Sequence, residues 1–440
     1  MQIDNILDRC LKSGADMADV YLINRNSLSL TVRDNEVESV TKAAPTGLAI
    51  RYFKDGKMAF AHSSDINETS VDSLIIKCAA FAGSLESDKY AVLPSGKLGN
   101  IDFDIYGPEH TRTSTDDKIA YLRRLEALAL NYDPLINKSN GVTYEEEIIT
   151  KELANTNGVR GKYDFSYYKI ACSIVAEKAG EMYPGEGSLY VTHFDMLPSE
   201  EKIAENFASR AVRLIGGTPV EGGDYEIIFT PRAANSLLWG LEAALNGDSA
   251  NKGTSFLAGK IGQKMAVESL TLIDDATRPR GIGSRPFDDE GSPSAKNILI
   301  ENGILKGYLY DQKAALKAGA KSTAASRRDD YSSFPEIGIT NFYIAPGNIK
   351  INDVIASCKK GIIVEETQGW GLQGVNGQYS AGINGTLVQN GKKIRPVAGV
   401  TIAAGSDEIL NGIGAICDNI TFFDNFASPA IMVKRMTVGG

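Results

Sequence analysis

The apolar positions near the start of the chain switch from the period of a helix to the period of a strand. Ile6, Leu7, Cys10 and Leu11 share one face of a short predicted helix. Four strand-like runs follow, at residues 20–24, 27–33, 48–53 and 57–62. Asp55-Gly56 between the last two is a hairpin signal, and a second apolar helix is expected near residues 70–83. This pattern predicts an N-terminal α/β domain over residues 1–95, with helices and a mixed sheet.

A polar stretch with scattered glycine and proline separates this block from a second one at residues 110–217. Ser114 and Asp117 form a capping pattern at the start of a predicted helix. Strand-like runs come next, and Tyr163, Phe165 and Tyr167 fall on one side of the longest because side chains alternate along a strand. A further helix is expected before the glycines near residue 217. We expect a central α+β domain here.

Residues 224–440 are rich in strand-like runs joined by Asn-Gly pairs. Asn302-Gly303 and Asn390-Gly391 each join two such runs, which predicts β-hairpins over residues 298–310 and 387–397. A helix with apolar leucines precedes them at residues 237–245. The block therefore predicts a strand-rich C-terminal domain with a largely antiparallel sheet or sandwich, and the whole chain is assigned to the α+β class.

Composition narrows the classes of function. The 440 residues are 43% hydrophobic and 23% charged, as in ordinary globular proteins. The net charge of −9, with basic residues only in short pairs, argues against direct binding of nucleic acid. No apolar run reaches the length of a membrane span, and the acidic start lacks the features of a signal peptide. We expect a cytoplasmic protein that binds neither nucleic acid nor membrane.

The residues that usually carry hydrolytic chemistry are scarce. The three histidines, His62, His110 and His193, are far apart, and neither HExxH nor HExxxH occurs. There is no GxSxG elbow, and the five cysteines include no CxxC pair, which suits reduced thiols in the cytosol. The residues alone therefore predict no catalytic side chain and no metal ligand in this chain.

Two polar or glycine-rich segments remain as candidates. Residues 369–374 match GxGxxG, but a turn-like stretch follows in place of the helix that a dinucleotide site needs. We expect these glycines to let the loop pass close to another backbone or to a peptide. Residues 278–291 place three arginines among three acids. They suit either a metal or substrate loop or, the interpretation we favour, an internally salt-bridged loop that shapes a pocket or interface.

The same segments carry a resemblance to a known family. The motifs that resemble the TldD/PmbA family occur at residues 272–275, 283–291, 300–308, 374–376, 379–382 and 437–440. Members of that family are described as modulators of DNA gyrase and as metallopeptidases. They occur as paired subunits: the TldD type carries HExxxH, and the PmbA type, also called TldE, lacks it. The pair trims peptides, including peptide precursors and unfolded proteins.

The resemblance also implies which positions would hold zinc. Trp239 and Gly240 stand where the motif has its first histidine and its glutamate, and Ala244 stands where it has its second histidine. Those side chains would bind zinc and activate its water, so their replacement leaves this chain without the motif. The chain thus resembles the PmbA/TldE type, with no cofactor of its own and with zinc expected in a TldD-like partner.

The sequence therefore predicts a non-catalytic subunit of a zinc metalloprotease that processes unfolded peptides or peptide precursors. Its partner would be a TldD-like paralogue in a heterodimer, or a second copy in a homodimer. Five residues are candidates for the peptide-binding wall or the interface: Arg285, Asp288, Asp289, Glu290 and Asn376. Two alternatives stay open: a non-proteolytic binding protein that modulates DNA gyrase, and a self-contained peptidase whose metal site uses the acids near residues 274–290.

Overall fold

The computed structural model describes residues 3–99 and 101–439, and it has an α+β fold. Gly440, the last residue of the terminal family motif, lies outside the described residues. The helices are α1 (Ile3–Lys12), α2 (Glu68–Ser84), α3 (Thr115–Leu130), α4 (Glu200–Arg213), α5 (Asn235–Leu245), α6 (Gly247–Asn251), α7 (Gln312–Ala318), α8 (Ile351–Ser357) and α9 (Ser406–Gly412). In this part of the chain no helix is long and apolar enough to cross a bilayer.

One large sheet contains the strands of the first half of the chain. Its strands are β1 (Met17–Arg33), β2 (Glu36–Ala43), β3 (Thr46–Lys54), β4 (Lys57–Ser63), β5 (Ile136–Asn155), β6 (Arg160–Lys178) and β7 (Glu181–Val191). The order is β4-β3-β1-β5-β6-β7, and β2 pairs with the C-terminal half of β1. The sheet therefore joins strands from the two predicted N-terminal segments, whose bounds at 1–95 and 110–217 stay a prediction.

The expectation of a mixed N-terminal sheet is wrong, because every described pairing in this sheet is antiparallel. Short turns join β1 to β2, β3 to β4, β5 to β6 and β6 to β7, and each of these pairs is an antiparallel hairpin. Asp55 and Gly56 form the predicted turn between β3 and β4, both with positive φ. Positive φ at both central residues is typical of a hairpin turn that matches strand twist.

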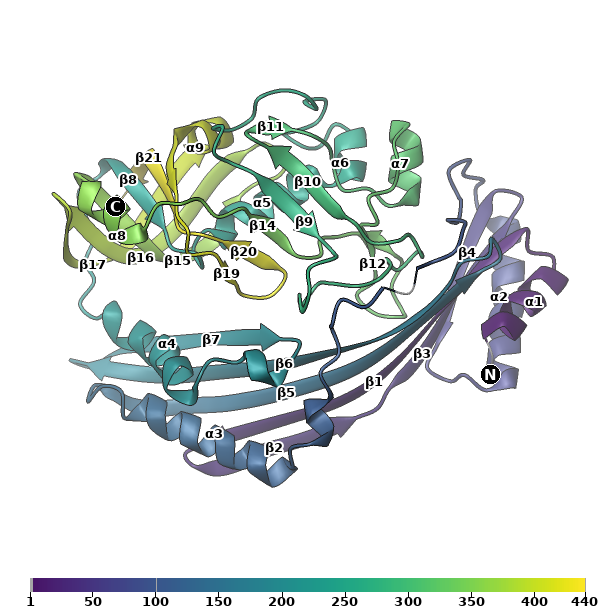
Figure 1. Ribbon diagram of the computed structural model, residues 1–440, viewed down its shortest axis with the longest axis horizontal. Coiled ribbons are helices and arrows are strands. Elements are labelled where there is room, and N and C mark those ends of the chain that lie inside the picture. The colour runs from purple at the N-terminus through teal and green to yellow at the C-terminus, as the bar shows by residue number, and fades with distance from the viewer. Residues whose placement is uncertain (1–2, 100, 440) are drawn as a thin grey trace.

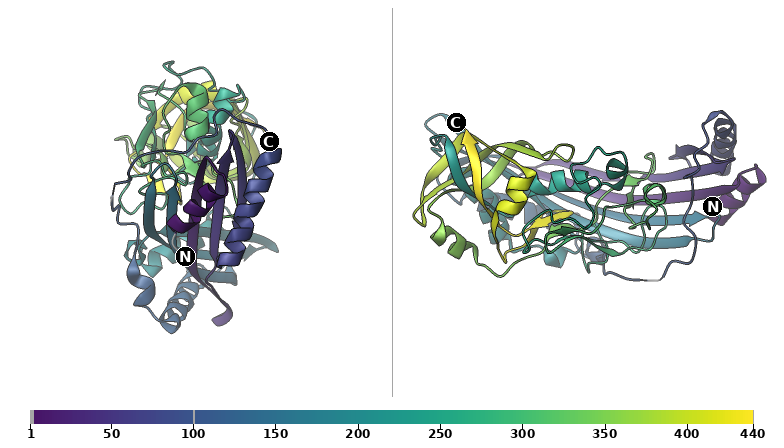
Figure 2. Two further views of the ribbon diagram at one scale, coloured as in Figure 1. Left: turned by 90° about the vertical axis from the view of Figure 1, so that its right-hand side faces the viewer. Right: turned by 90° about the horizontal axis from the view of Figure 1, so that it is seen from above.

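The sheet is curved and has two different faces (Figure 1). On its outer face, apolar side chains of β1, β5 and β6 are buried under α3 and α4. Helices α1 and α2 bury a second apolar cluster, made by the start of β1 together with β3 and β4. Figure 2 shows from above that the strands run along the length of the molecule toward α1 and α2. The inner face packs against the C-terminal domain, where Phe287 and Tyr331 contact the cluster around Tyr21, Ile23 and Ile149.

The C-terminal strands form a closed barrel, a second sheet and a two-stranded sheet of β12 and β13. The strands are β8 (Gly223–Phe229), β9 (Leu272–Asp275), β10 (Lys296–Glu301), β11 (Ile304–Leu305), β12 (Ser326–Arg327), β13 (Glu336–Ile337), β14 (Phe342–Ile344), β15 (Lys360–Leu372), β16 (Gln378–Gln389), β17 (Lys392–Gly405), β18 (Ile413–Ile416), β19 (Thr421–Phe422), β20 (Phe426–Ser428) and β21 (Ile431–Gly439). Pairing of β17 with β21 closes the path β17-β16-β15-β8-β21 into a barrel.

The predicted strand-rich and largely antiparallel character of the C-terminal domain is confirmed, but a closed barrel with a second sheet takes the place of the predicted single sheet or sandwich. The pairing is largely antiparallel, and β8–β15 and β14–β20 are the parallel pairs among the named strands that the structure describes. The turns at Asn302-Gly303 and Asn390-Gly391 form as predicted, with positive φ at all four residues. The second sheet, of order β11-β10-β9-β14-β20-β19, shares with the barrel one core that includes the apolar face of α5.

Candidate functional site

Helix α5 lies at the centre of the candidate site, where the family motif would place its metal. The chain leaves β8 through Thr230, whose hydroxyl oxygen accepts a hydrogen bond from Ala233 N at 3.3 Å. A short turn follows, and the helix begins at Asn235. Its inward face is apolar and buried, whereas Trp239 is 50% exposed. The helix ends at Asn246, whose side chain caps α6.

The irregular end of β15 and the turn after it, residues 369–377, press their backbone onto α5, and we call this segment the β15–β16 loop. A Cβ atom added to Gly240 would overlap the carbonyl oxygen of Leu372, and one added to Gly371 would overlap the carbonyl oxygen of Ser236. At Gly374 an added Cβ would come within 2.6 Å of Ala243 Cβ. This close approach confirms the predicted role for Gly371 and Gly374, whereas a Cβ atom at Gly369 would meet nothing within 4 Å. The Ser236 hydroxyl also hydrogen-bonds the Tyr379 hydroxyl at 2.9 Å and so ties β16 to the helix.

The residues at the metal-motif positions do not fit zinc. Trp239 has no metal-binding atom, Gly240 is covered by Leu372, and Ala244 is completely buried. Within residues 3–99 and 101–439, no group of three His, Cys, Asp or Glu side chains is placed to hold a metal ion. His193 instead sits between Thr192 and Asp104, with its ring nitrogens 3.0 Å and 3.4 Å from their oxygens.

One carboxyl group on α5 has an unusual environment. Burial is the main cause that raises the pKa of Glu242 to about 7; the charge of Arg327 works against the rise, and those of Asp274 and Asp424 add to it. Asp274 is itself buried, and its pKa is raised to about 6 for the same main reason. In the sequence Glu242 is a lone acid. Asp274 of β9 and Asp424 of the turn before β20 are far from it along the chain, and only the fold brings their charges near it.

A groove runs beside the exposed face of α5. Two adjoining cavities of about 280 and 260 Å³ share Arg232, Glu366 and Phe423 in their walls. The first also contains Arg210 and Arg213 of α4, and the second contains Tyr190 of β7 with Asn235 and Trp239 of α5. We call this feature the α4–α5 groove. Together the two cavities reach the size of small-ligand sites, and nothing in the sequence brings their separate segments together.

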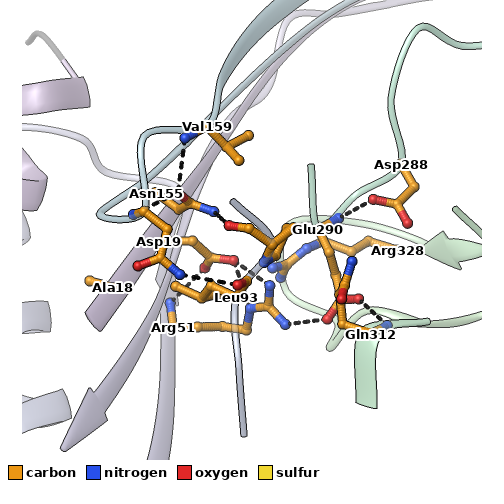
Figure 3. A network of polar contacts seen from close by, with 12 residues as sticks. Ala18, Asp19, Arg51, Leu93, Asn155, Val159, Asp288, Glu290, Gln312 and Arg328 are labelled. Atoms are coloured by element: carbon orange, nitrogen blue, oxygen red, sulfur yellow. Dashed lines mark hydrogen bonds and ion pairs between the residues drawn. The ribbon is translucent and has the colours of Figure 1, made fainter. Parts of the chain in front are cut away.

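The acidic loop predicted as a wall or interface lies elsewhere, between the sheet and the C-terminal domain (Figure 3). Arg51 of β3 donates to Glu290 Oε1 at 2.8 Å and to Asp19 Oδ2 at 2.8 Å. Lys151 of β5 lies 3.2 Å from Asp289, and Arg285 lies 3.9 Å from it. Four of the five candidate wall residues are thus buried in one polar network.

Neighbouring cations offset the charge of one acid in this network but not that of the next. Burial alone would raise the pKa of Asp289, but Lys151 and Arg285 lower it below its usual value. Burial and then the charge of Glu290 raise the pKa of Asp288 to about 7. Asp288 accepts hydrogen bonds from the backbone N–H groups of Ser292, at 2.7 Å, and Glu290, at 3.1 Å, which shape the loop.

Asn376, the fifth candidate, is in the exposed loop between β15 and β16. Its side chain donates to Gln373 and accepts from the backbone of Gln378, at 3.2 and 3.0 Å. The same loop carries Trp370, which is 86% exposed, and Val375, which is 70% exposed. Asn376 is therefore not part of the acidic loop's network. It lies in an exposed, partly apolar turn.

Comparison with known proteins assigns all three parts of the chain to one family. Residues 18–82, 108–215 and 222–440 match the models for domain 1, the central domain and the C-terminal domain of PmbA/TldA metallopeptidases. The metalloprotease PmbA homolog of Haemophilus influenzae is 26% identical, and the match covers 98% of this chain and 93% of that protein. The metalloprotease PmbA of Escherichia coli O157:H7 is 24% identical over 98% of this chain and 94% of that protein.

Solved structures share the fold over the whole length. TldE of Thermococcus kodakarensis superposes with a TM-score of 0.90 at 23% identity and covers 99% of both chains. A Bacteroides thetaiotaomicron protein, named as a proposed modulator of DNA gyrase, has a TM-score of 0.91 at 23% identity and covers 100% of this chain and 98% of its own. With matched domains, full-length relatives and the same fold, this chain belongs to the PmbA/TldD metallopeptidase family.

Proposed function

We propose that this chain is a non-catalytic subunit, of the PmbA/TldE type, in a zinc metalloprotease that processes unfolded peptides or peptide precursors. The observation that carries the proposal is the packing on α5. Backbone of the β15–β16 loop covers Gly240 at the position of the motif glutamate, and Ala244 is buried at the position of the second histidine. At these two positions the helix has no room for the side chains that the zinc motif requires.

The inner face of the curved sheet supports a role in handling peptides. Side chains alternate along a strand, so Glu147, Tyr167 and Lys169 lie on the face that packs against the C-terminal domain nearby. They are half-buried, and Lys169 lies 5.6 Å from the centre of the Tyr190 ring. Such a mixture of aromatic and charged groups suits an extended chain of varied sequence, held mainly through its backbone.

The proposal assigns the chemistry to a partner. A TldD-like paralogue would contribute zinc and the attacking water, and this chain would complete the peptide-binding cleft. The exposed loop with Trp370 and Val375 offers apolar surface to such a partner, because large exposed apolar side chains often mark interaction sites. A second copy of this chain is the alternative occupant of that surface.

The proposal is tested by peptide cleavage. The purified chain, an HExxxH-bearing paralogue and an equimolar mixture are each incubated with an unstructured peptide, and products are followed by mass spectrometry. We expect efficient cleavage only in the mixture, with loss of activity on adding a chelator. A paralogue whose motif glutamate is replaced by glutamine is the matched control, and it should be inactive in the mixture. Cleavage by the chain alone, or full activity of the paralogue alone, would contradict the proposal.

A further inference from the structure

Three arginines converge in the α4–α5 groove. Arg210 and Arg213 extend from α4, and Arg232 comes from the turn that leads into α5. Burial, and then the charges of Arg232 and Arg213, lower the pKa of Arg210 to about 10. A buried cation next to two other cations is costly unless an anion offsets it.

The acids of the groove offset this charge only in part. Arg213 is paired with Glu365 at 3.0 Å. Arg210 is 8% exposed, and among residues 3–99 and 101–439 its guanidinium donates only to the Glu186 carbonyl and the Asn206 side-chain oxygen, both neutral and both at 2.8 Å. Glu366 also lines the groove but makes no ion pair with an arginine among the described residues. The first cavity therefore keeps an excess of positive charge.

Two polar groups of the groove have no partner in the described part of the chain. The half-buried side chain of Arg232 makes no hydrogen bond or ion pair there, although it lines both cavities. Asn235 Oδ1 is a buried acceptor without a donor. A buried polar atom without a partner costs free energy, so a free guanidinium beside a free acceptor marks a place where a ligand can supply both partners.

Resting on the proposed function, we infer that the α4–α5 groove binds the C-terminal carboxylate of an extended peptide. The planar guanidinium of Arg232 matches a carboxylate through two parallel hydrogen bonds, and Arg210 adds its charge from below. Asn235 Oδ1 accepts from an N–H of the last peptide unit. Trp239 and Phe423 supply an apolar surface for the last side chain of the peptide.

The position of the groove agrees with this ligand. Tyr190, on the inner face of the sheet, lines the second cavity, so the groove continues from the surface proposed to carry the peptide. The first cavity has three arginines against Glu365 and Glu366, whereas the second has only Arg232 against Asp424 and the shared Glu366. This balance favours the first cavity as the place for the charged end. The peptide body would then cross the second cavity toward the sheet.

The test compares one unstructured, fluorescently labelled peptide in two forms, with a free C-terminal carboxylate and with a C-terminal amide. Binding to the full chain is measured by anisotropy. We expect the acid to bind about tenfold more tightly than the amide, as for one charge-assisted contact. In Arg232→Gln that ratio should fall to near one. Arg435→Gln, at a 77% exposed arginine far along the chain, should keep the full ratio.

Other outcomes overturn the inference. The inference is wrong if the acid and the amide bind equally, or if neither binds. It is also wrong if the ratio stays unchanged in Arg232→Gln. Inorganic phosphate is added as a competitor, and displacement of the acid peptide by micromolar phosphate would assign the groove to phosphate instead. The acid-to-amide ratio is independent of the cleavage assay, so failure of the groove assignment and failure of the subunit proposal are distinguished.

Discussion

The guanidinium of Arg51, on β3, lies 2.8 Å from the carboxylate of Glu290 in the C-terminal domain, and 239 residues separate the two in sequence. Both side chains are 5% exposed, and Asp19 of β1 shares the same guanidinium. This ion pair joins the curved sheet to the loop that carries the acidic family motif.

Removing the cation should therefore destabilise the whole chain. Arg51→Met leaves Asp19 and Glu290 buried without their shared partner, and we expect a loss of about 3–5 kcal/mol in the free energy of unfolding. Urea denaturation followed by circular dichroism measures it. Arg33→Met is the control, because Arg33 is 40% exposed and its ion pairs are longer than 3.4 Å, so its loss should stay below about 1 kcal/mol. Equal losses in the two variants would contradict the account.

The packing of the β15–β16 loop on α5 predicts a sharp difference between two glycines. Gly240→Ala places a methyl group against the Leu372 carbonyl and should cost about 1–3 kcal/mol or more. Gly83→Ala in α2 meets no atom within 4 Å and should be neutral or stabilising by up to about 1 kcal/mol. Thermal and urea unfolding of both variants measure this. If Gly240→Ala were as stable as the parent chain, the loop would not lie on the helix as described.

Glu242 predicts a pH dependence of stability with a defined sign. Its pKa is raised from an ordinary value of 4.5 to about 7, so between these values the folded chain keeps a proton that the unfolded chain releases. Stability contributed by the neutral carboxyl is complete below pH 4.5 and is lost as the pH rises toward 7. In Glu242→Gln the fall in stability between pH 5 and pH 8 should shrink by about 2 kcal/mol. Exposed Glu268→Gln should leave the profile unchanged; a profile unchanged in Glu242→Gln as well would refute the assignment.

The exposed loop predicts a variant that separates pairing from stability. Trp370→Ser changes a side chain that is 86% exposed, so the free energy of unfolding should change by less than about 0.5 kcal/mol. If the proposed partner covers this loop, association with an HExxxH-bearing paralogue should weaken at least tenfold in sedimentation velocity. Ile76→Ser, at a 67% exposed residue of α2, is the matched control and should pair normally. Normal pairing of Trp370→Ser would remove the loop from the interface.

Local turns were accessible from the sequence because their signals are local. Asp55-Gly56, Asn302-Gly303 and Asn390-Gly391 each form the hairpin that their positive-φ preference predicts. The expected mixed sheet was wrong because the period of apolar residues indicates that a segment is a strand. It does not indicate which strand pairs with it or whether the pair is parallel. Closure of the barrel by β17 and β21 depends likewise on pairing between distant segments.

Only part of the candidate site could be predicted from the sequence, because the rest depends on contacts between segments that are distant along the chain. Motif position identified Trp239, Gly240 and Ala244, and the glycines of residues 369–374 indicated a close backbone contact. Arg232 carries no sequence signal, because its importance comes from α4 and the loop before β20, which reach it only in the folded chain. The prediction of an internally salt-bridged acidic loop was largely wrong: Arg285 lies 3.9 Å from Asp289, but the closer partners of Asp289 and Glu290 are Lys151 and Arg51 of the N-terminal sheet.

The pairing of β1 with β5 sets an order of events in synthesis. The side chain of Arg25 in β1 donates to Glu147 Oε1 in β5 at 3.0 Å, yet 122 residues separate the two in sequence. A nascent chain therefore exposes one edge of β1 until β5 has left the ribosome, and such an edge readily pairs with other chains. Non-local pairing of this kind also slows folding. During synthesis the N-terminal segment is thus open to pairing with other chains until β5 covers this edge.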